Sequence, residues 1–219
     1  MSTEADAIAT DLLHAMGRDQ PIRSADGMVL FDPTTHVYRH MPSGRDLPSV
    51  TCVLEATGVR EPYHGDPIYG IRGTWVHACA ELVDQGDLDW DRAEAEHSDW
   101  LPYVRAYERF LRENTVEILG TEEVVWNERW FYAGRCDRRI MLNGVLTRPD
   151  LKSGQPQRSD LVQIAMYDET DPEHPHDLRP IYLRKDGNYR APAVDPDDQA
   201  EARSVARAAA AIGRWRGRK

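Results

Sequence analysis

The sequence predicts an α/β (α+β) fold, with a central mixed β-sheet flanked by helices and a mainly helical N-terminal lobe. Three observations predict it. Apolar residues recur at helical spacing through much of the first half of the chain. A period of two takes over from residue 122, and Asn143-Gly144 supplies the strongest short hairpin signal. A helix, a strand and an Ala-rich helix then follow, an order typical of a sheet covered by helices.

The elements of the first half are predicted from periodicity and from capping residues. Ser49 or Thr51 is a suitable N-cap for a short helix, and Gly58 is suited to end it. Two short strands are expected around Asp32-Pro33. Helices are predicted over residues 3–16, 50–57, 74–85 and 98–115.

The second half should form the sheet. Three successive strands are predicted from "EEVVWNERWFYAG" and the hairpin that follows it. A helix capped by Ser159 or Asp160, the strand "RPIYLRK" and a closing Ala-rich helix come next. We therefore expect a single domain over residues 1–219, made of the N-terminal lobe (1–118), a sheet core (119–192) and a C-terminal helix with a basic tail (193–219).

Composition limits the classes of protein. The chain of 219 residues carries a net charge of −10, and no run of apolar residues is long enough for a membrane span. Its three cysteines are scattered without a C-x-x-C pair, which predicts a reducing, cytoplasmic location and no cysteine-bound cluster such as an iron–sulfur centre. The acidic balance means that any nucleic-acid surface must be local.

Two aspartates and a lysine should converge on the predicted hairpin. If Asn143 and Gly144 form a two-residue turn, Asp137 lies opposite Asp150, and Lys152 points to the same face as Asp150. Like charges directly opposite each other destabilise a strand pair. A divalent cation between the two carboxylates would explain the arrangement.

Other polar residues are candidates at lower specificity. His77 and Glu81 share one face of a predicted helix, Glu123 begins a strand, and Gln163 and Tyr167 are spaced four apart on the helix after the hairpin. Each alone is typical of an ordinary surface or half-buried position. The histidines of "HPH" at 174–176 are expected in a solvated loop rich in proline and aspartate.

The order of these motifs carries more information than any one of them. G-x-x-x-H at 73–77 is followed by a glutamate before a strand, G-x-x-D at 134–137, D-x-K-S-G at 150–154 and Q-x-x-x-Y at 163–167. This order resembles the PD-(D/E)XK nuclease superfamily, closest to the RecB-like branch of phage, CRISPR-associated and mitochondrial genome maintenance exonucleases. "LPSVT" at 47–51 also looks like the N-terminal lobe of that branch.

The resemblance implies a restriction-endonuclease-like core and a metal-dependent deoxyribonuclease, an exonuclease or end-processing enzyme that leaves 5′-phosphates. One or two Mg²⁺ or Mn²⁺ ions would be held by His77, Asp137, Asp150 and the carbonyl of Leu151. Lys152 would orient the attacking water or stabilise the developing oxyanion. The remaining roles implied are catalytic support by Gln163 and Tyr167, and supporting positions at Glu81 and Glu123.

The expected partner is DNA, as linear or single-stranded ends, and no membrane. Arg135, Arg139 and Arg148, with Arg158, are expected to line a positive groove, because the first three share strand parity with Asp137 or Asp150. Arg138 should point to the other side of the sheet. Some exonucleases of this fold form rings, so a homo-oligomer is possible for this chain. A recombination or replication partner is possible as well.

Two alternatives stay open. The chain could be an inactive nucleic-acid-binding or assembly protein on the same fold, since a net charge of −10 is unusual for a protein that holds DNA. It could instead be a metallohydrolase of small phosphate esters. The sequence does not decide between exonuclease and endonuclease, between DNA and RNA, or the polarity of cleavage.

Overall fold

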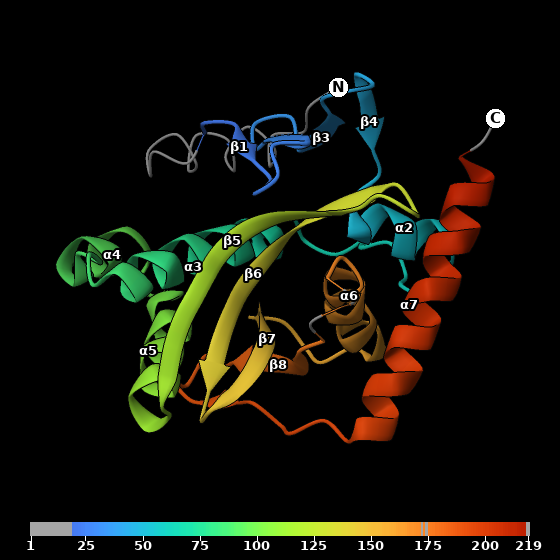
Figure 1. The fold of residues 1–219 in the computed structure, drawn as a ribbon. Helices are drawn as coiled ribbons and strands as arrows, with labels where there is room; N and C mark the ends of the chain where they lie inside the picture. Colours follow the sequence, from blue (N-terminus) through green and yellow to red (C-terminus); the bar gives the residue numbers. More distant parts are fainter. Residues whose placement is uncertain (1–18, 172, 174, 218–219) are drawn as a thin grey trace.

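The computed structural model describes residues 19–171, 173 and 175–217. The helix predicted at residues 3–16 lies outside these ranges. The described chain forms a mixed α and β fold with two sheets (Figure 1). Among the described residues, no helix has the length and apolar character needed to cross a membrane.

The described part of the N-terminal lobe begins with a small antiparallel sheet of four strands in sequential order. The two middle strands were predicted, but the two outer ones were not, because two or three residues give no periodic signal. Left-handed glycines, Gly27 (φ 72°) and Gly44 (φ 67°), turn the chain between the strands. The strands are β1 (Ile22–Arg23), β2 (Val29–Asp32), β3 (Val37–His40) and β4 (Arg45–Leu47).

Four helices follow in the part of the lobe that the structure describes. Ser49 caps the first by accepting a hydrogen bond from the amide of Cys52, as predicted. Gly86 ends the second in a left-handed conformation (φ 70°). The third helix was not predicted, and its N-cap is Asp89. The helices are α2 (Val50–Ala56), α3 (Ile68–Gln85), α4 (Trp90–His97) and α5 (Leu101–Glu113).

The main sheet has the order β5-β6-β7-β8-β9 and is mixed, as predicted. The pairs from β5 to β7 are antiparallel, whereas β7 and β8 are parallel and are connected through α6. Gln157, rather than Ser159 or Asp160, caps α6, and Asp160 completes its capping box. The elements are β5 (Val116–Asn127), β6 (Tyr132–Leu142), β7 (Val145–Lys152), α6 (Arg158–Asp168), β8 (Asp177–Leu183), β9 (Tyr189–Arg190) and α7 (Pro196–Arg216).

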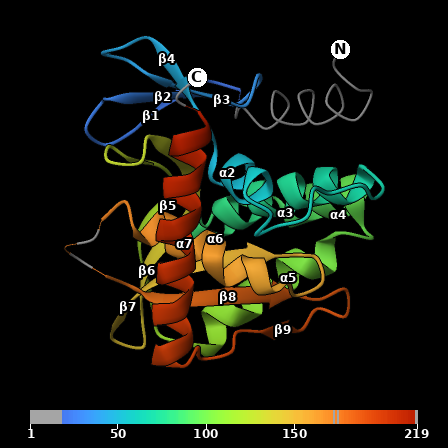
Figure 2. The same cartoon turned by 90° about the vertical axis from the view of Figure 1, so that its right-hand side faces the viewer.

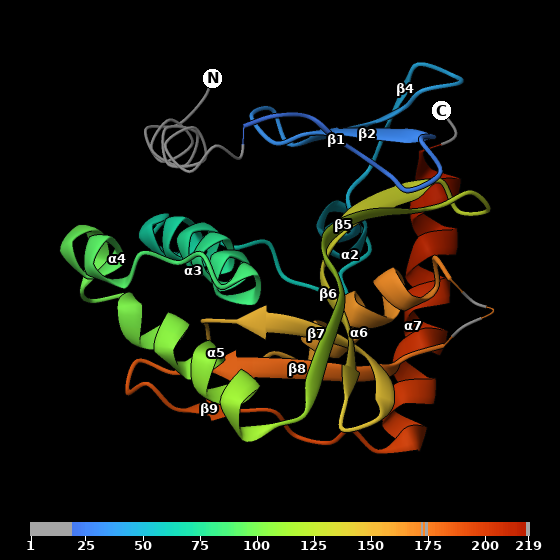
Figure 3. The same ribbon diagram turned by 60° about the vertical axis from the view of Figure 1, so that its left-hand side comes forward.

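Each face of the main sheet is covered by helices. Side chains of α3 and α5 pack with Ile140, Leu151 and Ile181 in one core. Helices α2, α6 and α7 pack with Cys136 and Leu178 in a second core on the other face (Figures 1 and 2). The small N-terminal sheet packs against the upper parts of β5 and β6 in a third core (Figure 3). The middle of α3, the middle of β6 and the end of β7 therefore come together between the three cores.

Candidate metal centre

Three side chains that commonly bind metals gather beside the main sheet. His77 comes from α3, Glu122 from β5 and Asp137 from β6, and one ligand atom from each lies within 4.8 Å of the others. Both carboxylates are buried, whereas the imidazole is partly exposed. An imidazole nitrogen with two carboxylate oxygens is a chemically suitable donor set for a divalent metal. This cluster could hold a metal ion.

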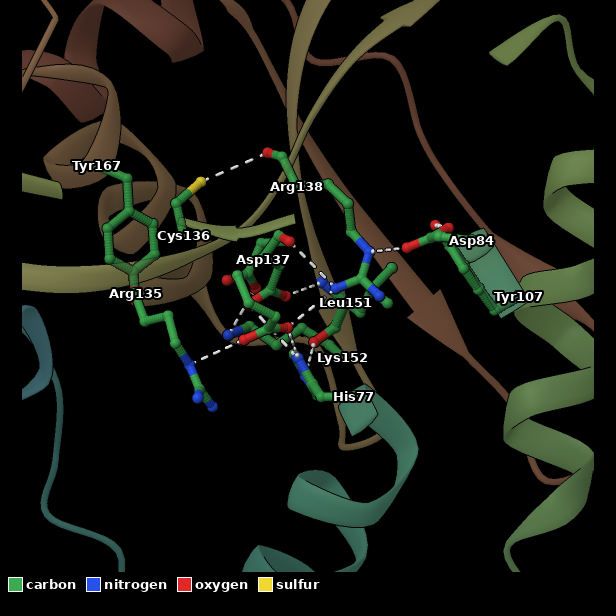
Figure 4. A network of polar contacts seen from close by, with 12 residues as sticks. His77, Asp84, Tyr107, Arg135, Cys136, Asp137, Arg138, Leu151, Lys152 and Tyr167 are labelled. Carbon is green, nitrogen blue, oxygen red and sulfur yellow. Dashed lines mark hydrogen bonds and ion pairs between the residues drawn. The ribbon is translucent and has the colours of Figure 1, made fainter. Parts of the chain in front are cut away.

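The ring of His77 is fixed by a hydrogen bond on its far side. Its Nε2 donates to the carbonyl of Leu151 at 3.1 Å, so Nδ1 faces the carboxylates, 3.5 Å from Asp137 Oδ1 and 3.6 Å from Glu122 Oε1 (Figure 4). Such a bond determines which ring nitrogen is available as a ligand. Burial alone would lower the pKa of His77, but the two carboxylates outweigh it and raise that pKa.

Glu122 links the cluster to two arginines. Its Oε2 lies 2.8 Å from Arg135 Nε, and its Oε1 lies 3.0 Å from Arg138 Nη1. Burial would raise its pKa, but His77 and the two arginines lower it to about 2. The backbone of Glu122 is left-handed (φ 50°), which is uncommon for a residue other than glycine and costs on the order of 1–3 kcal/mol. The carboxylate is therefore ionised and held at a fixed position.

The hairpin has the predicted register and then opens at the site. Asn143 and Gly144 both have positive φ, and the pairs Leu142–Val145 and Ile140–Thr147 confirm the two-residue turn. The ladder pairing of β6 with β7 ends at Ile140–Thr147. Beyond that point, Asp137 Oδ2 accepts a hydrogen bond from the amide of Leu151 at 2.7 Å. The Asp137 side chain thus bridges the two strands where they separate.

Asp150 and Lys152 form a second polar group next to this cluster. Lys152 Nζ lies 2.6 Å from Asp150 Oδ2 and donates to Gln163 Oε1 at 3.1 Å. Gln163 in turn donates to the hydroxyl of Tyr167 at 3.1 Å. Burial raises the pKa of Asp150 to about 7, with a further contribution from Asp137 and against the effect of Lys152. The four residues predicted from the D-x-K and Q-x-x-x-Y motifs are therefore in direct contact.

Gly134, the glycine of the G-x-x-D motif, lies where a side chain would not fit. A Cβ atom at this position would lie 2.5 Å from Cε1 of Tyr167 and 3.0 Å from a methyl group of Val50. The bare backbone of β6 therefore lets the Tyr167 ring pack closely against the strand. This contact places the hydroxyl that holds Gln163.

A cavity of about 240 Å³ opens onto the cluster. One wall is formed by Tyr38 of β3 and by His36 in the turn before that strand. The start of α2 forms another wall. The cluster forms the third wall, with Arg135 beside it. A ligand in this cavity would lie against both the N-terminal lobe and the main sheet.

Some predicted residues are placed away from the cluster. Glu123 pairs with Arg139 at 3.1 Å, and both are partly exposed. Glu122, the neighbour of Glu123, lies in the cluster instead. Because Arg139 pairs with Glu123, the expectation that Arg139 faces the cluster is wrong. Glu81 contacts Gln85 on the same helix and does not belong to the gathered group.

Two arginines expected in a positive groove have other contacts. Arg148 is buried, with Cys136 Sγ at 3.3 Å and Asp168 at 3.8 Å, because α6 and α7 cover that part of the sheet face. Arg158 is exposed and pairs with Glu201 of α7 at 2.8 Å. Of the four predicted groove arginines, Arg135 alone lines the cavity.

Arg138 and His176 also differ from expectation. Arg138 is fully buried and joins Glu122 to Asp84 of α3, at 2.9 Å, so its guanidinium supports the cluster. His176, expected in a solvated loop, is buried and bonds to Asp168 at 2.8 Å.

Sequence reasoning missed two residues of the site, of which one carried a partial signal and the other carried none. Glu122 was visible as one of two adjacent acids, but strand alternation alone does not say which one faces the cluster. Arg60, whose Nη1 donates to Gln163 Oε1 at 3.0 Å, carried none, because it lies 103 residues away in a loop.

Comparison of the sequence with models of protein families found no match. Comparison with curated proteins likewise found no relative.

Proposed function

We propose that this protein is a metal-dependent nuclease that hydrolyses phosphodiester bonds in DNA, acting at ends and leaving 5′-phosphates. One observation carries the proposal: Asp137 lies in the cluster with His77 and also bonds to the strand that bears Asp150 and Lys152. Carboxylates and an imidazole, next to an ammonium, form a donor set suited to phosphate chemistry.

The residues present fit a divalent cation of the Mg²⁺ or Mn²⁺ type. His77, Glu122 and Asp137 would hold it, with Asp150 adjacent, and the imidazole favours Mn²⁺ over Mg²⁺. Such an ion would neutralise charge on the scissile phosphate and lower the pKa of a bound water. The finer fold assignment, a restriction-endonuclease-like core around β5 to β8, is part of the same proposal.

Lys152 would act on the reacting phosphate directly. Its ammonium is held between Asp150 Oδ2 and Gln163 Oε1, which limits the positions that Nζ can adopt. A fixed positive charge in a largely buried position stabilises a developing oxyanion far better than a mobile, solvated one. Gln163 and Tyr167 would serve as positioning residues through their hydrogen bonds to each other and to Lys152.

The test is cleavage of three substrates by the purified protein. End-labelled linear DNA, covalently closed circular DNA and bis(p-nitrophenyl) phosphate should each be incubated with Mg²⁺, Mn²⁺ or a chelator. We expect the protein to degrade linear DNA when Mg²⁺ or Mn²⁺ is present and not when a chelator is present. Asp137→Asn and Lys152→Met should each lower the rate by about 10²-fold or more. Arg158→Gln, at an exposed position paired with Glu201, is the matched control and should leave the rate unchanged.

The outcomes separate the alternatives. Cleavage of closed circles would make the enzyme an endonuclease. Binding of DNA without cleavage of any substrate would favour an inactive binding protein. Absence of both binding and cleavage, with each metal, would refute the proposal.

A hydrolase of small phosphate esters is the second candidate. The observation in its favour is that all four predicted groove arginines have a carboxylate partner within 4.0 Å. These pairs reduce the positive charge available to a long polyanion. Cleavage of the small diester together with no binding of DNA would favour this candidate.

A further inference from the structure

An exposed segment carries two tyrosines next to the candidate site. We call residues 59–72, which follow α2 and include the first turns of α3, the α2–α3 arm (Figure 3). Every residue from 61 to 70 is exposed. Of the seven large hydrophobic residues exposed in the described part of the chain, three lie in this arm: Tyr63, Ile68 and Tyr69. Such clustering is typical of a binding surface rather than of scattered surface residues.

The base of the arm is anchored to the residues that flank Lys152. Arg60 donates to Gln163 Oε1, the same oxygen that accepts from Lys152. Arg72 donates to the carbonyl of Ser153, the next residue after Lys152, at 2.7 Å. The exposed tyrosines between these two arginines therefore lie at the end of the site that Lys152 occupies.

Arg60 and Arg72 differ from the arginines of the main sheet in the charge of their partners. Within the described residues, Arg60 and Arg72 have neutral partners and no carboxylate within 4.0 Å, unlike Arg135 or Arg139. Arg72 also lies 5.0 Å from the ring centroid of Tyr69 and 4.7 Å from that of the buried Tyr103. No carboxylate among the described residues therefore neutralises the positive charge of either arginine.

Contacts with the protein hold the two tyrosine rings in exposed positions. Tyr63 donates its hydroxyl to the carbonyl of Asp66 at 3.0 Å and lies over Gly65, yet the residue is 58% exposed. Tyr69 is 53% exposed on the first turn of α3. A ring with one face on the protein and the other in solvent can stack with a flat ligand.

We infer that the α2–α3 arm binds a single-stranded segment of nucleic acid, with bases stacked on Tyr63 and Tyr69 and phosphates at Arg60 and Arg72. Aromatic platforms next to cations are the chemistry by which proteins hold unpaired strands. The inference rests on the proposed function and specifies it further: the strand that reaches Lys152 is unpaired, since bases within a duplex cannot stack on side chains.

The experiment measures binding and cleavage separately. Binding of a fluorescein-labelled oligo(dT) of about 12 nucleotides, a length that spans a typical single-strand site, is followed by anisotropy in Ca²⁺. A labelled hairpin duplex is the second ligand. Tyr63→Ala and Tyr69→Ala should each weaken oligo(dT) binding roughly 5- to 150-fold. Tyr63→Phe and Tyr69→Phe keep the rings and should stay within about twofold of the wild type.

The arginines are tested by salt dependence. Arg60→Gln and Arg72→Gln should each reduce the slope of log K against log salt by about 0.7, the value for one contact on a single strand. Arg158→Gln, on the surface of α6, is the matched control and should leave the slope unchanged. Far-ultraviolet circular dichroism of each variant checks that the fold is retained.

Each outcome bears on one of the two ideas. Equal binding by the alanine and phenylalanine variants would overturn the inference, while cleavage of DNA by the wild type would leave the nuclease proposal standing. A loss of binding confined to the alanine variants, without cleavage by the wild type, would support the arm and refute the nuclease. Tighter binding of the duplex than of oligo(dT), or a dimer in sedimentation that Tyr69→Ala dissociates without an effect on DNA binding, would also overturn the inference.

Discussion

Replacing Arg138 by methionine should destabilise the protein by about 3–5 kcal/mol, the cost of removing one partner from a buried ion pair. The Arg138 side chain has no exposed surface and contacts two buried carboxylates, those of Asp84 and Glu122. Methionine replaces the aliphatic part of the arginine side chain with an apolar chain that can adapt to the site, but it cannot pair with either acid. For a chain of this size, the loss corresponds to a fall in melting temperature of roughly 6–20 °C.

The neighbouring residue provides the matched control. Arg139 pairs with Glu123 as Arg138 pairs with Glu122, but its side chain is 37% exposed. Exposed ion pairs contribute about 0–1 kcal/mol. Arg139→Met should therefore change the free energy of unfolding by no more than about 1 kcal/mol. Urea denaturation at pH 7, followed by circular dichroism, measures both variants under identical conditions.

The pH dependence of the Arg138 variant gives a second check. Burial raises the pKa of Asp84, and Arg138 opposes that rise. Without the guanidinium the pKa should rise further, so the folded variant takes up a proton more readily than the unfolded chain. Its deficit relative to wild type should shrink as the pH is lowered from 7 toward 5. Equal costs for Arg138→Met and Arg139→Met, or a deficit independent of pH, would refute this reasoning.

Three further outcomes are expected. Gly134→Ala should cost about 1–3 kcal/mol of unfolding free energy, because the new methyl group overlaps the ring of Tyr167; an unchanged urea midpoint would contradict this. Burial would raise the pKa of Asp168, but bonds from His176 and Arg203 lower it, so its stabilisation is present above about pH 4 and is lost below it. The stability difference between wild type and Asp168→Asn should accordingly narrow in urea titrations below pH 4, and a constant difference would argue against it. Ca²⁺ should tighten binding of a labelled DNA end, and equal affinity in chelator would argue against a cation at the cluster.

The hairpin was predictable because its signal is local. Asn143 and Gly144 tolerate the positive φ that a two-residue turn needs, and the turn fixes the register of both strands. Asp137 and Asp150 accordingly lie on adjacent antiparallel strands, as predicted. Their sharing of a cation stays a prediction, because Asp150 is engaged by Lys152 and lies outside the gathered group.

The choice between Glu122 and Glu123 was not predictable for a physical reason. A shift of one residue in register turns every side chain of a strand to the other face. The connection between β5 and β6 contains no Asn-Gly signal, and its last residue, Phe131, has φ 61°. The pairing of β5 with β6 also shifts between Ile118 and Gly120. Glu122 itself departs from strand geometry, so no alternation rule could have placed its carboxylate.

The parity of Arg148 was inferred correctly, but its environment was not. Arg148 shares one face of β7 with Asp150 and Lys152, and Lys152 contacts α6 through Gln163. At Arg148 that face is covered by the end of α6 and by α7. Strand alternation assigns a face, whereas the helices that pack on it are determined by tertiary structure. Tertiary structure likewise determines buried polar contacts such as that between Asp168 and His176.

The charges around the cluster bear on how an acidic protein could hold a polyanion. Apart from His77, the buried network contains more carboxylates than cations. The acids are Asp84, Glu122, Asp137 and Asp150, and the cations are Arg135, Arg138 and Lys152. The arginines therefore stabilise the acids instead of presenting a surplus of positive charge to a phosphate. One divalent cation would reverse the sign of this balance and would make metal binding and phosphate binding interdependent. The net charge of −10 is thus compatible with a DNA substrate, provided that the positive charge comes from the cation and from the α2–α3 arm rather than from the sheet.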